Sequence, residues 1–572
     1  MVQNTDGKAA ARRWLKTLAA AGCALLGFLV HHSTYAAESA SSQKRLVEMR
    51  RITQDQYRQI IADVFGRTIK LGGRFEPDQR DSGLIAVGAG EASVTASGYE
   101  QYDGMARSIA GQVLDEQRRA TMLACRPADP KAADDACAKQ FIARIGRILY
   151  RRPLTDTELV AEIGIASGAT AKVHDFYAGL ALSLAGMLEA PQFLFRQEWA
   201  EADPEHPGSY RLDAYSKASR LSFLLWNAAP DPLLLEAAEK GELNDTAGLK
   251  RQVDRMLASP RVEAGVRAFF ADMLSFSSFE TLAKDSVLYP KFVSRAPADA
   301  QEQTLRTIID LLVTRHGDYR DIFTTRRTFL TPLLAAIYKI PIETPNDLPD
   351  VWVPYEYPEN AEQAGIVTEA SFVALHSHPG RSSPTIRGKA LREILLCQKV
   401  PDPPGNVNFA VVQDTSNPEF KTARARLTAH RTNPTCAGCH KIMDPVGLSL
   451  ENFDTTGGFR LTENGVAIDA SGELDGTKFS DPIGLGRALH DSAAATACVV
   501  NRLVSYGLGH APTKADSDWV RNDVAKQFAT DGYRFIDLLR DIATSDQFYR
   551  VTPPEMRADA GADRHDRSAK PE

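Results

Sequence analysis

The stretch Cys436-Ala437-Gly438-Cys439-His440 decides how the C-terminal part of this sequence is interpreted. Two cysteines three positions apart, followed at once by a histidine, form the pattern that attaches haem covalently to a chain. The thiols bond to the porphyrin, and the adjacent imidazole becomes the proximal iron ligand. The motif predicts one haem c, attached through Cys436 and Cys439, with His440 on the iron and a c-type-cytochrome-like fold around it.

Two other interpretations of the motif fit the sequence less well. A structural zinc site usually needs a second close pair of Cys or His ligands, which the sequence does not contain. A thioredoxin-like dithiol belongs in a βαβ context, whereas this chain has helical periodicity. Haem c is therefore the favoured interpretation, and a chance match in an exported protein is the remaining alternative.

The N-terminus has the three parts of an export signal. Basic residues between Lys8 and Lys16 precede the apolar run Leu18–Val30, and Thr34-Tyr35-Ala36 offers a cleavage site. A run of about 13 residues is too short to span a bilayer stably. We expect residues 1–36 to be a signal peptide and the mature chain to be periplasmic or secreted without a stable membrane span. An uncleaved anchor is the alternative.

Export also determines how the other cysteines are expected to pair, because unpaired thiols are uncommon in oxidising compartments. Cys125 and Cys137 are close in sequence and are natural partners. Cys397 and Cys498 remain once the two haem cysteines are set aside. We therefore expect the disulfides Cys125–Cys137 and Cys397–Cys498, the second by elimination.

The composition is that of a soluble protein with several domains. The chain has 572 residues, of which 43% are hydrophobic and 24% charged, and its formal net charge is -6. No long basic run is present, which argues against nucleic acid as a partner. We expect a mainly α, multi-domain helical protein with a C-terminal c-type-cytochrome-like haem domain and long Pro-rich loops.

Local patterns place the elements along the chain. Leu46–Val64 has apolar residues at helical spacing, with Thr53 as a cap, and Thr155 with Glu158 forms a capping box. The proline-rich stretch 341–358 predicts a linker or covering loop, and Ile468–Phe479 predicts turns or a hairpin. The expected domains are a signal peptide (1–36), an N-terminal helical domain (37–125), a second helical domain (126–200), a central helical domain (201–340), a Pro-rich linker and pre-haem segment (341–425), a c-type haem domain (426–552) and a disordered tail (553–572).

The sequence that follows the motif resembles a known family. From Cys439 to Arg460 the chain matches every fixed position of the pattern CHxxMDPxGxxLENFDxxGxxR. This pattern is similar to the haem segment of large exported proteins of planctomycetes and other bacteria, which are assembled from consecutive domains of unknown function. Further similar blocks include residues 50–66, 150–158, 189–196, 221–226, 365–368, 381–388 and 503–509. The resemblance covers nearly the whole mature chain and implies a haem protein without assigning a reaction.

The sixth iron ligand decides which chemistry such a haem can carry out. Met443 lies only three residues past His440, so we expect it to pack on the haem edge rather than to cross to the distal side. The expected distal ligands are His376 or His378, in a loop rich in Ser, Pro and Gly. His430, His490 and His510 are further candidates for this position.

Two further kinds of contact are expected near the haem. Arg387 and Arg460 could pair with the haem propionates, because the guanidinium fork fits a carboxylate, although surface ion pairs are an alternative for both. Asp469, Glu473 and Asp475 form an acidic turn that could bind calcium, but their spacing does not match an EF-hand loop.

These observations favour one function and leave another open. A single haem motif favours periplasmic electron transfer to or from a partner enzyme. The roughly 400 residues before the motif favour the alternative, a haem peroxidase or oxidase acting on a periplasmic or extracellular substrate. A scaffold with a vestigial haem is the third option. No nucleophile elbow, P-loop or HExxH motif supports a hydrolase.

Overall fold

The computed structural model describes residues 44–293, 295–343, 351–401, 417–430 and 434–552, without the side chains of residues 429, 430 and 434–436. The predicted signal peptide (1–36) and the predicted tail (553–572) lie outside the described residues. The chain divides into two compact units. Of the described residues, the smaller unit contains 44–49, Gln197–Ser216 and 549–552, and the larger one contains those within Arg50–Arg196 and Lys217–Phe548.

The smaller unit is built on a four-stranded sheet of order β1-β2-β3-β10. Its strands are β1 (Arg45–Arg51), β2 (Phe195–Ala202), β3 (Tyr210–Leu212) and β10 (Arg550–Val551), and β3 pairs antiparallel with both β2 and β10. The helix predicted over Leu46–Val64 is therefore wrong in its first third. Pairing with β2, which is distant in sequence, outweighs the local helical spacing of residues 45–51.

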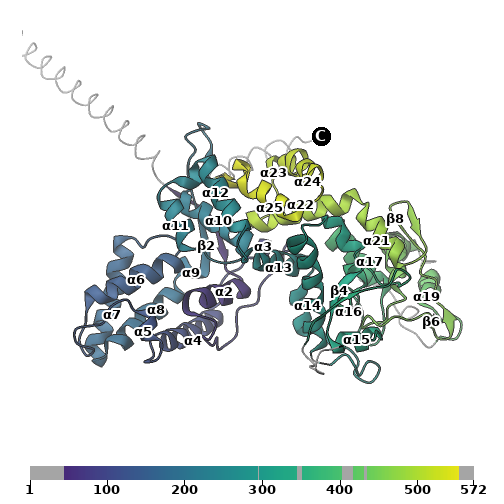
Figure 1. Cartoon of the computed structure of the whole chain (residues 1–572), viewed down its shortest axis with the longest axis horizontal. Helices are drawn as coiled ribbons and strands as arrows, with labels where there is room; N and C mark the ends of the chain where they lie inside the picture. The colour runs from purple at the N-terminus through teal and green to yellow at the C-terminus, as the bar shows by residue number, and fades with distance from the viewer. Residues whose placement is uncertain (1–43, 294, 344–350, 402–416, 431–433, 553–572) are drawn as a thin grey trace, which may run out of the picture. The chain divides into compact units, whose positions relative to one another are not determined.

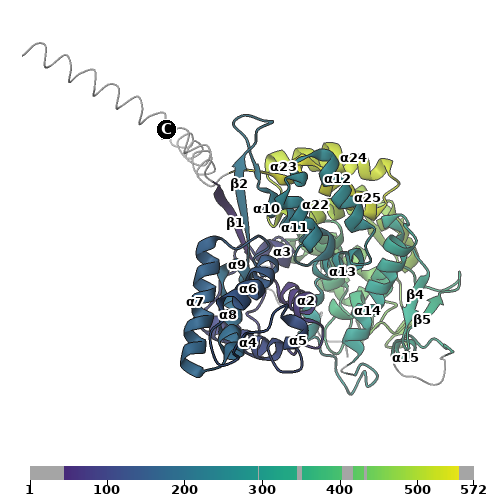
Figure 2. The same cartoon turned by 60° about the vertical axis from the view of Figure 1, so that its left-hand side comes forward.

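The N-terminal part of the larger unit is a helical bundle (Figures 1 and 2). Its helices are α2 (Gln54–Phe65), α3 (Ile85–Gly88), α4 (Ala96–Val113), α5 (Arg119–Met122), α6 (Asp135–Leu149), α7 (Asp156–Val173), α8 (Phe176–Glu189) and α9 (Pro191–Leu194). Thr53 with Gln56 and Thr155 with Glu158 form complete capping boxes, which satisfy the first amides of α2 and α7. The capping box predicted at Thr155 is therefore confirmed.

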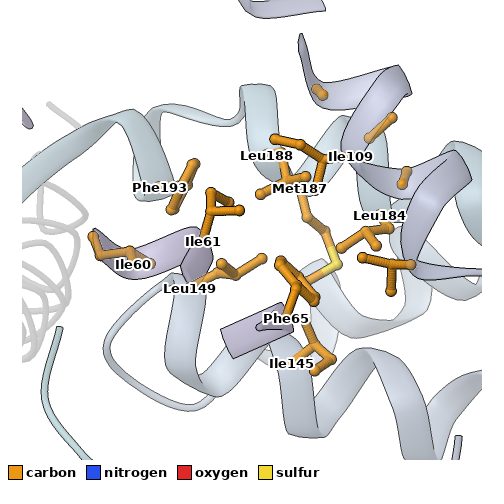
Figure 3. Packing of buried hydrophobic residues seen from close by; sticks show 14 of the residues in the cluster. Ile60, Ile61, Phe65, Ile109, Ile145, Leu149, Leu184, Met187, Leu188 and Phe193 are labelled. Carbon is orange, nitrogen blue, oxygen red and sulfur yellow. The ribbon is translucent and has the colours of Figure 1, made fainter. Parts of the chain in front are cut away.

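The core of this bundle is formed by aliphatic and aromatic side chains. Figure 3 shows side chains from α2, α4, α6, α8 and α9 meeting in its centre, among them Ile60, Ile61, Phe65, Ile109, Ile145, Leu149, Leu184, Met187, Leu188 and Phe193. All of them are buried, so removal of this apolar surface from water is the main stabilising contribution here.

The middle of the chain is also helical, with one two-stranded sheet. Its elements are α10 (Ala214–Trp226), α11 (Pro232–Glu239), α12 (Thr246–Leu257), α13 (Val262–Met273), α14 (Ala296–Ile309), β4 (Arg327–Leu330), α15 (Pro332–Tyr338) and β5 (Val353–Glu356). Strand β5 lies in the stretch expected to be a linker or loop and pairs antiparallel with β4. Pro354 is tolerated because a two-stranded sheet leaves one edge of each strand unpaired.

The C-terminal part of the larger unit combines short helices with two hairpins. Its helices are α16 (Ala370–Leu375), α17 (Pro384–Ala390), α19 (Ala423–His430), α20 (Pro434–Gly447), α21 (Pro482–His490), α22 (Ala493–Leu508), α23 (Lys514–Trp519), α24 (Ala525–Thr530) and α25 (Phe535–Thr544). The hairpins are β6 (Thr462–Glu463) with β7 (Val466–Ala467), and β8 (Gly472–Leu474) with β9 (Thr477–Phe479). The second confirms the hairpin expected within Ile468–Phe479.

The protein is mainly helical and contains both expected disulfides. Cys125 is bonded to Cys137, and Cys397 is bonded to Cys498. Disulfides persist in oxidising surroundings, so they indicate an extracellular or periplasmic location. Across the described ranges, no helix is both long and apolar enough to cross a membrane.

Candidate functional site

Helix α20 carries the Cys-x-x-Cys-His motif. Residues three and four apart share one face of an α-helix, so positions 436, 439 and 440 lie together on one side of α20. Cys439 is a partly buried free thiol, and its Sγ lies 3.9 Å from the carbonyl oxygen of Pro401. The side chain of Cys436 lies outside the described residues. The backbone thus presents the attachment positions and the histidine within little more than one turn.

His440 is held by a carboxylate one turn further along the same helix. Its Nδ1 lies 2.9 Å from Oδ2 and 3.1 Å from Oδ1 of Asp444. The His440 side chain is 12% exposed and that of Asp444 is 0% exposed. A histidine that binds metal commonly donates its second ring N–H to a carboxylate, which fixes the tautomer and the ring orientation. The pair therefore suits ligation through Nε2.

Helix α17 fixes the position of Asp444 from the other side. The hydroxyl of Thr385 donates to Oδ1 of Asp444 at 2.9 Å. The two helices touch backbone to backbone, because a Cβ on Gly388 would lie 2.0 Å from the carbonyl oxygen of Met443. A Cβ on Gly447 would likewise clash with the backbone of α17, at the carbonyl oxygen of Pro384. These glycines let α17 approach closely enough for Thr385 to reach the carboxylate.

Arg387 joins helix α17 to the turn that follows α20 through several hydrogen bonds. It is fully buried, and its guanidinium donates to the carbonyl oxygens of Leu450 (2.7 Å), Phe453 (2.9 Å) and Asp454 (2.7 Å) and to the Ser377 hydroxyl (3.0 Å). Burial lowers the pKa of Arg387 to about 10. These bonds give Arg387 a structural role in holding the turn after α20, and the contact expected with a propionate stays a prediction.

Arg460 and Met443 lie in the same segment. Arg460 is 25% exposed and donates to a carboxylate oxygen of Glu451 (3.0 Å) and to the Ser382 hydroxyl (2.9 Å). Glu451 is buried, and burial raises the pKa of its carboxyl group, with Arg387 and Arg460 opposing that rise. Met443 is 6% exposed and packs at the α17–α20 contact. Their predicted haem contacts stay predictions.

The expected distal histidines lie in a loop that the rest of the protein holds firmly. Thr455 donates to the carbonyl oxygen of His378 at 2.6 Å, and Lys284 donates to the carbonyl oxygens on both sides of His376. The bond from Thr455 attaches this loop to the segment that follows the motif. Arg387, which is bonded to the same segment, also donates to the Ser377 hydroxyl of the loop.

The two rings differ in surroundings. His376 stacks edge-on against Phe372, with ring centroids 4.8 Å apart, and borders a cavity of about 10 Å³. Burial lowers the pKa of His376 to about 3, and the charges of Arg387 and Lys284 add to that effect. Burial also lowers the pKa of the half-buried His378. Burial therefore favours the neutral form of both rings, which is the form that binds iron.

The other candidate residues are engaged elsewhere or not described. His490 contacts Asp321 and Asp491, and the Nδ1 of His510 lies 2.9 Å from its neighbouring carbonyl oxygen, while the side chain of His430 lies outside the described residues. In the acidic turn for which calcium was a minor possibility, Asp469 pairs with Arg424 and Asp475 pairs with Arg392. Among the described side chains, no group of three or more His, Cys, Asp or Glu could hold a metal ion.

Sequence reasoning overlooked Asp444 and Thr385. A signal for the first was present, because Asp444 lies four residues after His440 and therefore on the same face of a helix. Thr385 carried no such signal, since its contact depends on the packing of α17 against α20.

Comparison with protein families divides the chain into five consecutive segments. They match families described as proteins of unknown function, namely DUF1587 (residues 50–115), DUF1595 (137–198), DUF1592 (212–340), DUF1588 (363–463) and DUF1585 (475–548). No curated protein and no solved structure matches the chain significantly. The Cys436–Arg460 segment lies within the DUF1588 match, and the exact domain boundaries expected from the sequence stay predictions. The chain is therefore a succession of five domains of unknown function, in the arrangement of planctomycete-type cytochrome c proteins.

Proposed function

We propose that this chain is an exported mono-haem protein that transfers electrons to or from a partner protein in the periplasm. The observation that carries the proposal is helix α20, which puts a free cysteine thiol beside a histidine whose Nδ1 is held by a buried carboxylate. The donor set and the helical spacing fit a haem c. Such a group would supply a one-electron iron couple when bound.

Each residue of the site has a separate task in this proposal. Cys436 and Cys439 would hold the group covalently, and His440 would be its proximal ligand. His376 or His378 would provide the sixth ligand. A site with two strong-field ligands suits electron transfer, whereas an open sixth position suits peroxide or oxygen chemistry.

Replacing Cys436 and Cys439 together by alanine is expected to abolish covalent haem. Thioether bonds survive denaturation, so the full-length chain, expressed with a haem-attachment system, should stain for haem on a denaturing gel and the double variant should not. Ile442→Ala is the matched control, because Ile442 is 42% exposed on the same helix and carries no ligand atom. Staining that persists in the double variant, or none in the unmodified chain, would contradict the proposal.

Replacing the sixth ligand is expected to change the spin state. The ferric protein should show the absorption bands of six-coordinate low-spin haem, and His378→Ala or His376→Ala should convert them to high-spin bands. His490→Ala, on α21, is the control and should leave the spectrum unchanged. High-spin haem in the unmodified protein, with spectral shifts on adding peroxide, would favour the alternative, a haem peroxidase or oxidase. Low-spin haem that survives both substitutions would exclude both histidines as ligands.

A further inference from the structure

Asp444 differs from the other buried carboxylates of the haem-motif segment in what it contacts. Glu451 is paired with two arginines. Asp444 is at least as deeply buried, yet its side-chain contacts in the described part of the chain are the Thr385 hydroxyl and Nδ1 of His440. A buried carboxylate is costly unless its charge is compensated. Here the imidazole is the group placed to compensate it.

The geometry places this negative charge directly on the ring. Both carboxylate oxygens lie within 3.1 Å of Nδ1, and the surrounding protein excludes water from the carboxylate. A charge-assisted hydrogen bond of this kind is stronger in a low-dielectric interior than in water. It pulls the Nδ1 proton toward Asp444 and makes the opposite nitrogen, Nε2, a stronger electron donor.

Thr385 modulates the strength of the hydrogen bond between Asp444 and His440. Its hydroxyl donates to Oδ1, so it withdraws electron density from the same carboxylate that accepts from His440. The backbone contact between α17 and α20 at Gly388 keeps Thr385 at this distance. Thr385 and His440 therefore compete for one carboxylate, and their effects on the ring have opposite signs.

We propose that Asp444 is a positioning residue that lowers the reduction potential of the haem by making His440 a strongly donating ligand, with Thr385 moderating this effect. The inference rests on the proposed function, since it requires a haem ligated by His440. A more basic imidazole stabilises ferric iron relative to ferrous iron. The site is thus tuned to keep the iron oxidised and to give up its electron readily, unlike a site with a Met ligand, which raises the potential.

Redox titration of the haem-loaded full-length protein tests this inference. Asp444→Asn keeps the shape of the side chain and removes its charge, and we expect at least a tenfold increase in the ferrous-to-ferric ratio at a fixed ambient potential, which is about 59 mV for a one-electron couple. Thr385→Val should move the potential in the opposite direction. In a His376→Ala or His378→Ala background that has lost the sixth ligand, the ferrous haem would be five-coordinate, and resonance Raman spectra should show a lower iron–histidine stretching frequency once Asp444→Asn is added.

Asp454→Asn is the matched control. It removes one negative charge from the same segment, but Asp454 accepts from the amides of Thr456 and Gly458 and not from His440. We expect it to change the ratio less than twofold. If Asp444→Asn binds haem and behaves like this control, the inference is overturned while haem attachment stands. If the unmodified chain carries no haem, the proposed function itself fails.

Should Asp444→Asn fail to fold, Thr385→Val decides the question. A shift toward lower potential supports the competition between Thr385 and His440. An unchanged or higher potential contradicts it, because a merely structural threonine has no reason to lower the potential.

Discussion

Replacing Arg387 by methionine is expected to destabilise the larger unit by about 3–5 kcal/mol, because it leaves a buried partner charge and several carbonyl oxygens without donors. Arg387 is 0% exposed and donates to three carbonyl oxygens in the turn Leu450–Asp454. Its Nη1 also lies 3.5 Å from Oε1 of the buried Glu451. Methionine fills much of the space and supplies none of these donors. Urea unfolding followed by circular dichroism measures the loss.

The control for this prediction is an arginine in the same domain with an exposed partner. Arg424 pairs with Asp469 at 3.1 Å and also donates to the carbonyl oxygens of Asp469 and Ser471, but the side chains of Arg424 and Asp469 are 31% and 59% exposed, so water can replace these bonds. Arg424→Met should therefore cost less than about 1 kcal/mol. Equal losses of unfolding free energy in Arg387→Met and Arg424→Met would show that the burial of Arg387 does not determine how much it stabilises the protein.

Removing the Cys397–Cys498 disulfide is expected to cost about 4–5 kcal/mol, since it closes a loop of about 100 residues in the unfolded chain. The two cysteines are 101 positions apart in sequence. Cys397 lies in the DUF1588 segment and Cys498 in the DUF1585 segment, so the bond also ties two domains together. Replacing both cysteines by serine avoids a free thiol. Denaturant unfolding under non-reducing conditions gives the difference.

The second disulfide of the chain is a matched control. Cys125 and Cys137 are 12 positions apart, and a loop of that length predicts a loss of about 3 kcal/mol. Because loop-closure entropy grows with the logarithm of loop length, removing the Cys397–Cys498 bond should cost about 1–2 kcal/mol more stability than removing the Cys125–Cys137 bond. A larger loss from removing the Cys125–Cys137 bond would contradict the loop-entropy explanation.

Local sequence was a good guide wherever neighbouring residues decide the structure. The cap at Thr53 and the capping box at Thr155 and Glu158 follow from patterns within one or two turns. It failed at Arg45–Arg51 and Val353–Glu356, which form strands. Their partners are distant in the chain, so no window of sequence contains the hydrogen bonds that select the strand.

The same division holds for the candidate site. The motif Cys436–His440 was identifiable because covalent attachment demands fixed spacing in the chain. The roles of Thr385 and Arg387 were not, because each depends on groups that only packing brings near. The hydrogen bonds from Arg387 to carbonyl oxygens of the turn after α20 could not be foreseen from the sequence, and its expected contact with a propionate stays a prediction.

The sequence by itself predicted export and determined that the chain is mainly helical, with a haem-type motif in its C-terminal third. The two disulfides agree with an oxidising location, and the family matches agree with a five-domain arrangement. Those features depend on composition, local periodicity and fixed spacing. Only the tertiary structure decided that α17 and α20 touch at Gly388, that Asp444 is buried, and that the histidine loop is fastened to Thr455 and Lys284. The reason is physical, since a buried charge takes its properties from the groups packed around it, and these come from distant parts of the chain.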